Sequence, residues 1–473
     1  MEDLGRVETY LSERTLDIDP GPGARTPVAT AADLFAGLTD RRGNVVLLAL
    51  PSGTTLLRHL FGALHGGAVP VAVSPAMPAG RLEQVARRLG ARLLVTPHGR
   101  PAPGTAVRRL GDTVVATLPG PWQRHDPDHV IIMTSGTSGI FSGCLHRASS
   151  LFRNAARHAE SVGLGSHDTM LVTLPLNFSY ALVAQALAGL VTDARLVIAG
   201  PPFSRRGYLD AIVRHGVTSS SLTPFLLRHL LSERPPAGLR MLTVGGDGLP
   251  GEEVSRLVAG RPGLEVYITY GLTEAGPRVS TLAAHREPAH RHGSVGLPLR
   301  GVGVALRDVR DGVGELLVTS DTVMVRRVGT VDGPVDGPVD SPMDGAVDGR
   351  HAGTRRIATG DLFRLDPDGY LHFAGRLGDS CVVEGVKVSL PSVRRLATAL
   401  PGVVRAATRP CSGGAADEEH VPHDGQRFVL ELHMREVTRE AVRPVRAELH
   451  RLLLRAERPC RILAVPAADT PYK

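Results

Sequence analysis

Lysine is almost absent from this chain. Of its 54 basic residues only Lys387 and Lys473 are lysine, so 54 − 2 = 52 are arginine. Arginine carries a planar, permanently charged fork, whereas lysine carries a compact charge on a flexible stem, so the two are not interchangeable. We therefore expect the two lysines to stand where arginine could not serve.

Cysteine and long apolar runs are also scarce. The four cysteines, Cys144, Cys381, Cys411 and Cys460, show no C-x-x-C spacing, which predicts neither a zinc site nor a disulfide framework. No apolar run approaches the ~20 residues that span a bilayer, and Met1–Thr15 lacks the apolar segment of a signal peptide. The expectation is a protein of the reduced cytoplasm with no membrane partner.

Aromatic residues make up only 4% of the chain, with a single tryptophan. The net charge is 54 − 47 = +7, but the arginines are scattered along the sequence rather than clustered. A protein that binds nucleic acid usually needs a basic patch or aromatic stacking platforms. No nucleic-acid partner is therefore expected, and the oligomeric state is left open.

Apolar runs alternate with amphipathic stretches over most of the chain. An ordinary hydrophobic content of 42% over 473 residues suits two or three folded domains. Short, wholly apolar runs such as 45–50 are typical of buried parallel strands. Strand–helix alternation predicts a doubly wound α/β sheet. The expected strands are 45–50, 69–73, 92–96, 130–133, 170–174, 195–198, 219–222, 240–244 and 265–269. The expected helices are 56–64, 81–89, 149–162, 181–190, 205–215, 224–232 and 251–259.

The pattern changes near Ser294, where short β-like runs (303–307, 314–319 and 371–374) alternate with Gly and Asp turns. These runs predict a small β-barrel-like subdomain. Residues 331–349 repeat Val-Asp-Gly-Pro with a period of four, which forms neither ladder nor helix and predicts a surface loop. The last part of the chain mixes strands and helices, including a helix over 437–454, and predicts a small α+β C-terminal domain.

A glycine- and hydroxyl-rich segment follows the strand at 130–133. It reads Thr134, Ser135, Gly136, Thr137, Ser138 and Gly139. Small hydroxyl residues between glycines let backbone N–H groups and side-chain hydroxyls approach phosphate oxygens. Taken alone, such a segment is equally typical of a flexible turn.

Further segments follow in a fixed order: Gly245–Pro250, Tyr270-Gly271-Leu272-Thr273-Glu274, Gly293–Pro298, Gly314-Glu315-Leu316, Thr359-Gly360-Asp361 and Gly375-Arg376. In order and spacing the chain from about Val45 to Lys473 resembles the adenylate-forming (ANL) superfamily. That superfamily comprises acyl- and aryl-CoA synthetases, luciferases and the adenylation domains of peptide synthetases. The resemblance implies an N-terminal AMP-binding domain over 1–375, a hinge at 376–378 and a mobile C-terminal domain over 379–473.

The resemblance also implies a role for each matching residue. The Thr134–Gly139 loop would hold the β- and γ-phosphates of ATP. Tyr270 would stack on adenine, in a pocket lined by Gly246, Asp247 and Gly271. Thr273 would donate to the α-phosphate, and Glu274 would bind Mg²⁺, a hard cation that prefers carboxylate oxygens. Asp361 would accept hydrogen bonds from the ribose hydroxyls, and Arg376 would contact ribose or phosphate.

Lys473 matches the lysine that bridges the substrate carboxylate and the α-phosphate in relatives, although Tyr472 precedes it where relatives carry glycine. Lys387 lies in a variable segment and is equally compatible with a surface charge or a contact to the thiol substrate. Two further positions depart from the family pattern. Ser142 stands where the phosphate loop usually carries a lysine, which weakens the expected grip on the leaving phosphates. Gly378 stands at the hinge, where Asp or Lys is usual.

The acid-binding segment is the hardest to interpret. Asn177, Phe178 and Tyr180, with Gly246 and Gly271, match the family's substrate pocket, and Phe178 stands at the usual histidine. Amino-acid-activating relatives carry an aspartate here, but no acidic residue lies between Leu171 and Val191. A substrate with a free α-ammonium group is therefore not expected.

The resemblance implies a magnesium-dependent ligase of secondary metabolism that converts a small acid and ATP into an acyl-adenylate and pyrophosphate. The acyl group then passes to a nucleophile, with coenzyme A as the expected co-substrate. The open alternatives are the phosphopantetheine of an acyl or peptidyl carrier protein, an amine, an unusual acid such as nitrite, and a relative that binds nucleotide without turnover.

Overall fold

The computed structural model describes residues 3–19, 26–38, 42–98, 106–134, 142–230, 236, 238–329, 353–377, 380–384, 386–411 and 427–467. The chain forms two compact units. The larger comprises Met1–Ala76, Ala86–Met133 and Gly143–Leu377, and the smaller comprises Met77–Val85, Thr134–Ser142 and Gly378–Lys473. The smaller unit has a hydrophobic core of its own, built around Val393, Leu430, Leu432 and Leu449.

The first sheet of the larger unit has eight strands in the order β18-β8-β7-β3-β2-β4-β6-β5. Its central strands β7, β3, β2 and β4 run parallel, while β6 and β5 at one edge run antiparallel. All four residues of β2 are buried, as the continuous apolar run predicts for a strand covered on both faces. The bounds are β2 (Val45–Leu48), β3 (Val69–Ala72), β4 (Ala91–Pro97), β5 (Ala106–Leu110), β6 (Thr113–Thr117), β7 (His129–Thr134), β8 (Ser142–Arg147) and β18 (Arg326–Val328).

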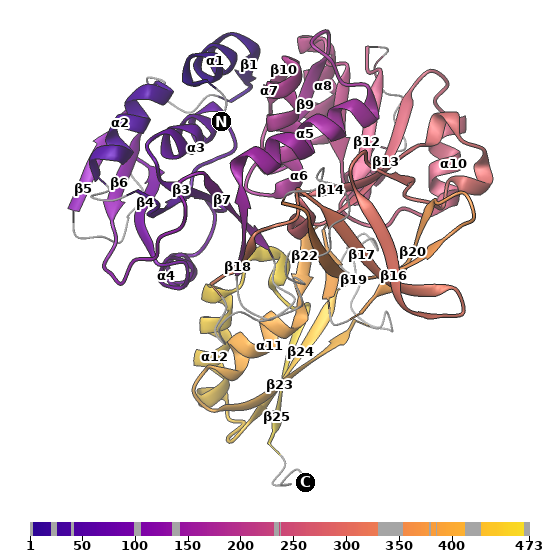
Figure 1. The fold of residues 1–473 in the computed structure, drawn as a ribbon. Helices are drawn as coiled ribbons and strands as arrows, with labels where there is room; N and C mark the ends of the chain where they lie inside the picture. Colours follow the sequence, from indigo (N-terminus) through magenta and orange to yellow (C-terminus); the bar gives the residue numbers. More distant parts are fainter. Residues whose placement is uncertain are drawn as a thin grey trace. The chain divides into compact units, whose positions relative to one another are not determined.

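The second sheet also has eight strands, in the order β1-β10-β9-β11-β12-β13-β14-β15. It is parallel from β1 to β13 and antiparallel beyond. Its strands are β1 (Thr15–Asp17), β9 (Thr169–Val172), β10 (Arg195–Ile198), β11 (Ser219–Leu222), β12 (Met241–Gly245), β13 (Glu265–Gly271), β14 (Arg278–Ala283) and β15 (Leu297–Pro298). Figure 1 shows the helices around the two sheets. They are α1 (Leu4–Thr9), α2 (Val28–Leu38), α3 (Thr54–His65), α5 (Ala148–Val162), α6 (Ser179–Ala181), α7 (Ala188–Thr192), α8 (Arg205–His215), α9 (Pro224–Arg228) and α10 (Gly251–Ala259).

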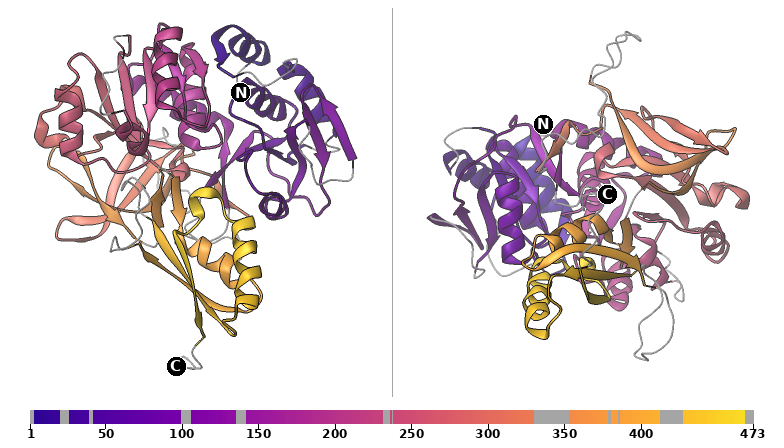
Figure 2. Two further views of the ribbon diagram at one scale, coloured as in Figure 1. Left: turned by 180° about the vertical axis from the view of Figure 1, so that it is seen from behind. Right: turned by 90° about the horizontal axis from the view of Figure 1, so that it is seen from below.

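The third sheet of the larger unit is antiparallel, in the order β16-β17-β19-β20. Its strands are β16 (Gly303–Arg310), β17 (Val313–Ser320), β19 (Arg355–Leu365) and β20 (Leu371–Arg376). Leu316 and Phe363 from this sheet share a buried cluster with Tyr270 of β13, so the third sheet packs against the end of the second. Figure 2 shows these sheets from two further directions.

Among its described residues, the smaller unit combines a two-stranded and a three-stranded sheet with two helices and most of α4 (Ala79–Arg88). Its elements are β21 (Ser380–Val383), β22 (Val386–Ser389), α11 (Leu390–Thr398), β23 (Val403–Pro410), β24 (Phe428–Met434), α12 (Arg439–Leu452) and β25 (Arg461–Pro466). The predicted α/β class, with a β-rich subdomain and an α+β C-terminal part, is confirmed. The residues that the structure describes include no helix long and apolar enough to cross a membrane.

Local features depart from the sequence-based expectations. The helix expected at 181–190 contains a π-helical stretch, Leu182–Leu187. Strand β8 stands between the phosphate loop and α5, where no strand was expected, and the short β1 joins the second sheet beside β10. The repeat at 331–349 and the expected hinge residue Gly378 lie outside the described residues.

The cysteine prediction was wrong in one respect. Cys411 and Cys460, 49 residues apart, form a disulfide in the smaller unit, while Cys144 and Cys381 are free and buried. The two bonded cysteines flank β24, because Cys411 follows β23 and Cys460 precedes β25 in the same three-stranded sheet. Sheet pairing, rather than a short sequence spacing, brings them together.

This disulfide predicts a thiol count. Protein purified without reductant, denatured and treated with an alkylating agent should take up label at Cys144 and Cys381 only, because the other two sulfurs are bonded to each other. Replacing both Cys411 and Cys460 by serine should lower the free energy of unfolding by about 2–4 kcal/mol. Mass spectrometry of the labelled peptides gives the count, and labelling of all four cysteines before reduction would contradict the pairing.

Candidate active site

Several predicted site residues of the larger unit lie at or just after the ends of strands of the second sheet. Strands β9, β11, β12 and β13 are parallel neighbours, so their carboxyl ends lie at the same edge. In open α/β sheets this edge is where ligands bind. Asn177 and Tyr180 follow β9, Gly246 and Asp247 follow β12, and Tyr270 lies near the end of β13.

Tyr270, Asp361 and Arg376 form one cluster of hydrogen bonds. The Tyr270 hydroxyl donates to Asp361 Oδ2 over 2.7 Å, and Arg376 Nε lies 3.0 Å from Asp361 Oδ1. Asp361 and Arg376 stand opposite each other on β19 and β20, so the ion pair is a cross-strand pair. The Asp361 side chain is only 1% exposed, and a carboxylate buried this deeply needs such partners.

The surroundings of the Tyr270 ring are consistent with this pairing. Phe363 meets the ring edge-on, with ring centroids 4.8 Å apart. Burial, followed by the negative charge of Asp361, raises the pKa of Tyr270 well above its usual value. The hydroxyl therefore stays protonated and remains a donor to Asp361.

Asp247 lies in the turn after β12, and the positive charge of Arg376 acts on its carboxyl. Desolvation raises the pKa of the Asp247 carboxyl, against the lowering effect of the Gly248 N–H and of Arg376 and Arg228. The Gly248 N–H donates to Asp247 Oδ1 over 2.8 Å. The preceding Gly246 has φ = +90°, a conformation that favours glycine. Two predicted nucleotide-pocket residues, Asp247 and Arg376, are thus close enough to interact electrostatically.

Gly271 is required by a close approach of the backbone. The register between β13 and β14 shifts at Tyr270/Gly271, and a Cβ at Gly271 would lie 1.8 Å from the carbonyl oxygen of Pro277. No larger side chain fits without moving the turn that carries Thr273 and Glu274. Glycine at this position therefore sets the geometry of the motif.

Thr273 and Glu274 each contact a residue that the sequence did not single out. The Thr273 hydroxyl lies 2.9 Å from Ser179 Oγ at the start of α6. Arg327 Nη2 donates to Glu274 Oε1 over 2.9 Å. Both residues belong to the 3-10 turn Thr273–Ala275 directly after β13.

Tyr180, which resembles an acid-pocket residue, belongs to a buried polar network. Its hydroxyl lies 3.2 Å from Thr243 Oγ1, and Thr243 donates in turn to Ser221 Oγ over 2.7 Å. The guanidinium carbon of Arg278 lies 4.0 Å from the centre of the Tyr180 ring, and Arg278 Nη1 donates to Thr269 Oγ1 over 2.7 Å. Arg278 is 3% exposed, and burial lowers its pKa.

The other two acid-pocket candidates make fewer contacts. The Phe178 side chain is 40% exposed, and its backbone N–H donates to the carbonyl oxygen of Pro175 over 3.0 Å. Asn177 is half-buried. The structure therefore connects Tyr180 to the site network more firmly than Asn177 or Phe178.

Of the Thr134–Gly139 phosphate segment only Thr134 is described, together with Ser142 beyond it. Thr134 Oγ1 donates to the carbonyl oxygen of Ser142 over 3.2 Å and lies 3.3 Å from Ser142 Oγ. Ser135, Gly136, Thr137, Ser138 and Gly139 lie outside the described residues, as does Lys473. Their roles remain predictions.

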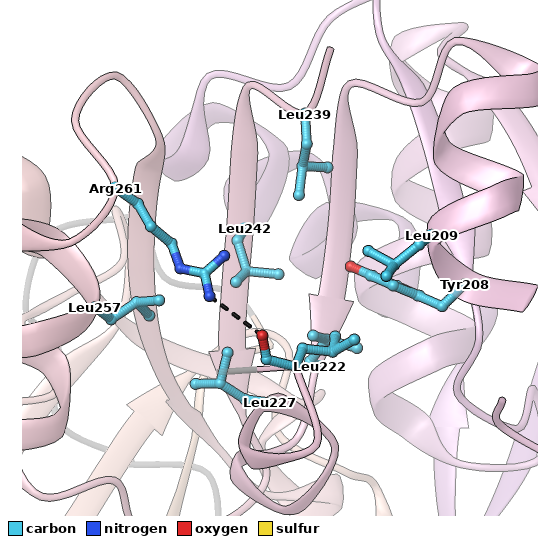
Figure 3. Close-up of a pocket in the computed structure, with 9 residues that line it drawn as sticks. Tyr208, Leu209, Leu222, Leu227, Leu239, Leu242, Leu257 and Arg261 are labelled. Carbon is cyan, nitrogen blue, oxygen red and sulfur yellow. Dashed lines mark hydrogen bonds between the residues drawn. The ribbon is translucent and has the colours of Figure 1, made fainter. Parts of the chain in front are cut away.

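A small apolar pocket elsewhere in the larger unit contains none of the predicted site residues. Leucines of β11, β12, α9 and α10 line it with Tyr208 and Arg261. Arg261 Nη2 donates to the carbonyl oxygen of Leu230 over 3.2 Å. Figure 3 marks this hydrogen bond with a dashed line. Because most of its lining residues belong to the core on that side of the second sheet, we interpret this pocket as a packing gap rather than a substrate site.

The model of the AMP-binding enzyme family matches residues 28–326, more than half of the chain. The chain belongs to the AMP-binding enzyme family. It is an adenylate-forming enzyme, an AMP-forming ligase. The ordered motifs predicted this assignment, and it is confirmed.

Among curated proteins, the chain is 28% identical over 464 residues to a sulfoacetate–CoA ligase of Cupriavidus necator, covering 92% of this chain and 86% of that protein. It is 29% identical over 405 residues to an isonitrile lipopeptide synthase of Streptomyces coeruleorubidus, covering 80% of this chain. The chain spans only 26% of that synthase's length. Members of the AMP-binding enzyme family similar to this chain thus include both a CoA ligase and a much longer synthase.

Solved structures share the fold of this chain. The amide bond synthetase McbA of Marinactinospora thermotolerans aligns over 100% of this chain and 97% of its own, with a TM-score of 0.74 and 20% identity. At this identity the likeness shows the fold alone.

Glu274 fits the chemistry of a magnesium ligand. Mg²⁺ is usually held by one or two carboxylates together with substrate phosphates, and it does not need a cage of protein ligands. The described residues contain no group of three or more His, Cys, Asp or Glu that could form such a cage. A single carboxylate, 13% exposed and beside the motif threonine, matches the expected pattern for a cation that arrives with ATP.

The buried carboxylate of Asp361 predicts the effect of removing one donor. In Tyr270→Phe the ring remains, but Asp361 Oδ2 loses its 2.7 Å hydrogen bond. We expect the free energy of unfolding in urea to fall by about 1–3 kcal/mol, because the lost bond is to a charged, buried acceptor.

Tyr10→Phe is the matched control for that measurement. It removes a buried hydroxyl that donates over 2.7 Å to the neutral carbonyl oxygen of Ala194. Its cost should be smaller, about 0.5–1.5 kcal/mol. Equal losses in the two variants, or none in Tyr270→Phe, would contradict the account of Asp361.

Proposed function

We propose that this enzyme activates a small carboxylic acid by adenylation and transfers the acyl group to the thiol of coenzyme A. In the first step a carboxylate oxygen attacks the α-phosphorus of ATP. A new O–P bond forms, and the bond from the α-phosphorus to the bridging oxygen breaks, so pyrophosphate leaves with the electron pair. In the second step the thiol loses its proton, attacks the acyl carbon and displaces AMP.

The residues at the carboxyl edge of the second sheet suit these steps. In this proposal Tyr270 and Asp361 position adenine and ribose, with Gly246 and Asp247 beside them. Thr273 donates its hydroxyl to the α-phosphate, and Lys473 bridges the two reacting groups. Mg²⁺, when bound at Glu274, supplies positive charge to the phosphates. Catalysis by this chain's own residues is then chiefly positioning and charge stabilisation, as phosphoryl chemistry requires.

One observation carries the proposal: the Tyr270–Asp361–Arg376 cluster joins two sheets at the edge where parallel strands end. It brings together residues 91 apart in sequence that the motif order assigned to one nucleotide. Coenzyme A as acceptor is supported by the sulfoacetate–CoA ligase, which aligns with 92% of this chain. A carrier-protein thiol or an amine as acceptor, and nitrite as the acid, are the other outcomes that the assay separates.

The first half-reaction can be tested without knowing the acceptor. Wild-type enzyme should exchange labelled pyrophosphate into ATP in the presence of its acid, tested with fatty, aromatic, hydroxy and small acids. Lys473→Ala should reduce this exchange by at least about a hundredfold, because it removes a charge from the transition state. It should still pass a preformed acyl-adenylate to the thiol.

Lys387→Ala is the matched control, since it removes the only other lysine. It should leave pyrophosphate exchange within about twofold of wild type, because the resemblance offers it a role only in the later thiol step. If no acid supports exchange or AMP release although the protein binds nucleotide, the chain binds without turnover and the proposal is wrong.

We also propose that the acid carries a second anionic group. Arg278 is a buried cation against the ring of Tyr180, in the segment that resembles the acid pocket. Its Nη1 donates to the neutral hydroxyl of Thr269, and its buried Nε has no hydrogen-bond partner among the residues that the structure describes. A buried cation is stabilised by an anionic partner, and sulfoacetate, the acid in a relative's name, carries a sulfonate beside its carboxylate.

Matched pairs of acids test this preference. A diacid should give at least about tenfold higher kcat/KM in the exchange assay than the monoacid of the same chain length, as expected for a charge-assisted contact. Arg278→Met should abolish the preference while retaining activity with the monoacid. Equal values for the two acids in wild type would contradict the second anionic group.

A further inference from the structure

The cationic lysine expected in the phosphate loop is missing, and the residue in its place, Ser142, is buried. Ser142 begins β8 with its side chain only 1% exposed. Its hydroxyl and carbonyl oxygens both face the Thr134 hydroxyl, at 3.3 and 3.2 Å. Adenylation still builds negative charge on the leaving pyrophosphate, and a fixed positive charge normally stabilises it. Besides the charge that Mg²⁺ would bring, any side-chain cation facing the leaving pyrophosphate has to come from a residue other than Ser142.

Strand register brings a cation to the same face of β8. Arg327 of β18 stands opposite Cys144 of β8 in an antiparallel pair. Residues that are directly opposite in such a pair share a face of the sheet, and alternation adds every second residue of the strand. Arg327 thus belongs to the face of β8 that carries Cys144 and Ser142. Consistently, Arg327 and Glu274 both shift the pKa of Cys144, which burial raises well above its usual value.

The guanidinium of Arg327 is held at one end. Its Nη2 donates to Glu274 Oε1 over 2.9 Å. Glu274 and Cys144 raise the pKa of Arg327 although desolvation alone would lower it, so it stays charged. The Arg327 side chain is 22% exposed and that of Glu274 is 13% exposed.

The other end of the guanidinium has no partner in the part of the chain that the structure describes. Arg327 Nη1 is buried there and donates no hydrogen bond. A buried donor without a partner costs free energy, and a ligand oxygen would recover it. The planar fork of arginine suits phosphate because it presents several donors in fixed directions.

We propose that Arg327 binds the pyrophosphate end of ATP and supplies the charge that Ser142 cannot. Glu274 orients the guanidinium through Nη2, which leaves Nη1 to donate to a phosphate oxygen. A carboxylate has about four lone-pair sites, so one oxygen can hold Arg327 while the group still serves a cation. This inference rests on the proposed function, since it assigns a residue to the same ATP site.

The neighbouring arginine provides a matched control. Arg326 lies next to Arg327 on β18, opposite Leu145 rather than Cys144, and therefore on the other face. Its Nη2 lies 2.9 Å from His125 Nδ1. Replacing Arg326 removes the same charge from the same strand without touching Glu274.

Binding of three probes separates this role from a structural one. AMP, ATP and inorganic pyrophosphate, each with Mg²⁺, are titrated by calorimetry into wild type, Arg327→Gln, Arg327→Lys and Arg326→Gln. We expect Arg327→Gln to lose about tenfold or more in affinity for ATP and pyrophosphate, with AMP affinity within about twofold, because AMP lacks the phosphates that the guanidinium meets. Arg327→Lys should lose less affinity for ATP and pyrophosphate than Arg327→Gln does. Arg326→Gln should match wild type.

Kinetics should show the same split: in Arg327→Gln the KM for ATP rises, while the KM for the acid stays near its wild-type value. Parallel losses for AMP and ATP, or an unchanged ATP affinity, would overturn the role of Arg327. If Arg327→Gln fails to fold, as judged by thermal melting, the ATP-to-AMP affinity ratio of Arg327→Lys decides. A wild-type protein that binds neither AMP nor ATP would instead overturn the proposed function itself.

Discussion

The carboxylate of Asp361 is the group on which the site depends. It is almost fully buried on β19, and a charge in that position is tolerated only with donors around it. Tyr270 provides one donor from the end of β13, and Arg376 provides the other from β20. Because the three residues come from two different sheets, satisfying this one charge fixes the third sheet against the edge of the second. That edge is where the loops with Gly246, Thr273 and Glu274 come together.

Buried cations need fixed partners just as the Asp361 carboxylate does. In a chain with only two lysines, the cations of the site are arginines held in this way. Arginine forms ion pairs with carboxylates at defined angles, and three of the arginines at the site each have a distinct anchor. Arg376 pairs with Asp361, Arg327 with Glu274, and Arg278 lies on the ring of Tyr180 with a hydrogen bond to Thr269. A guanidinium fixed in this way has a permanent direction, which a lysine on a flexible loop lacks. Replacing a loop lysine by Ser142 is therefore compatible with an intact charge distribution when another strand provides the guanidinium.

Much of the fold was readable from local patterns. Apolar runs such as Val45–Leu48 and Val69–Ala72 are buried strands, and the amphipathic stretches between them are helices. The order of the motifs predicted the family. It also assigned Tyr270, Asp361 and Arg376 to one nucleotide site, and in the structure these three residues form one hydrogen-bonded cluster. The pairing of β8 with β18 and the disulfide of Cys411 with Cys460 could not be predicted. Each depends on contacts between distant segments, which hydrophobic periodicity does not encode. For the same reason Arg327, 53 residues from Glu274, carried no signal beyond belonging to an Arg-Arg pair.

The central claim is that an acid oxygen attacks the α-phosphorus of ATP at this site. The most direct measurement uses an acid that supports turnover, labelled with ¹⁸O in its carboxylate, followed by mass spectrometry of the products. The account predicts that one labelled oxygen appears in the phosphate of AMP, since the acyl–oxygen bond breaks when the acceptor attacks. Label in inorganic phosphate with formation of ADP, or unlabelled AMP, would contradict it.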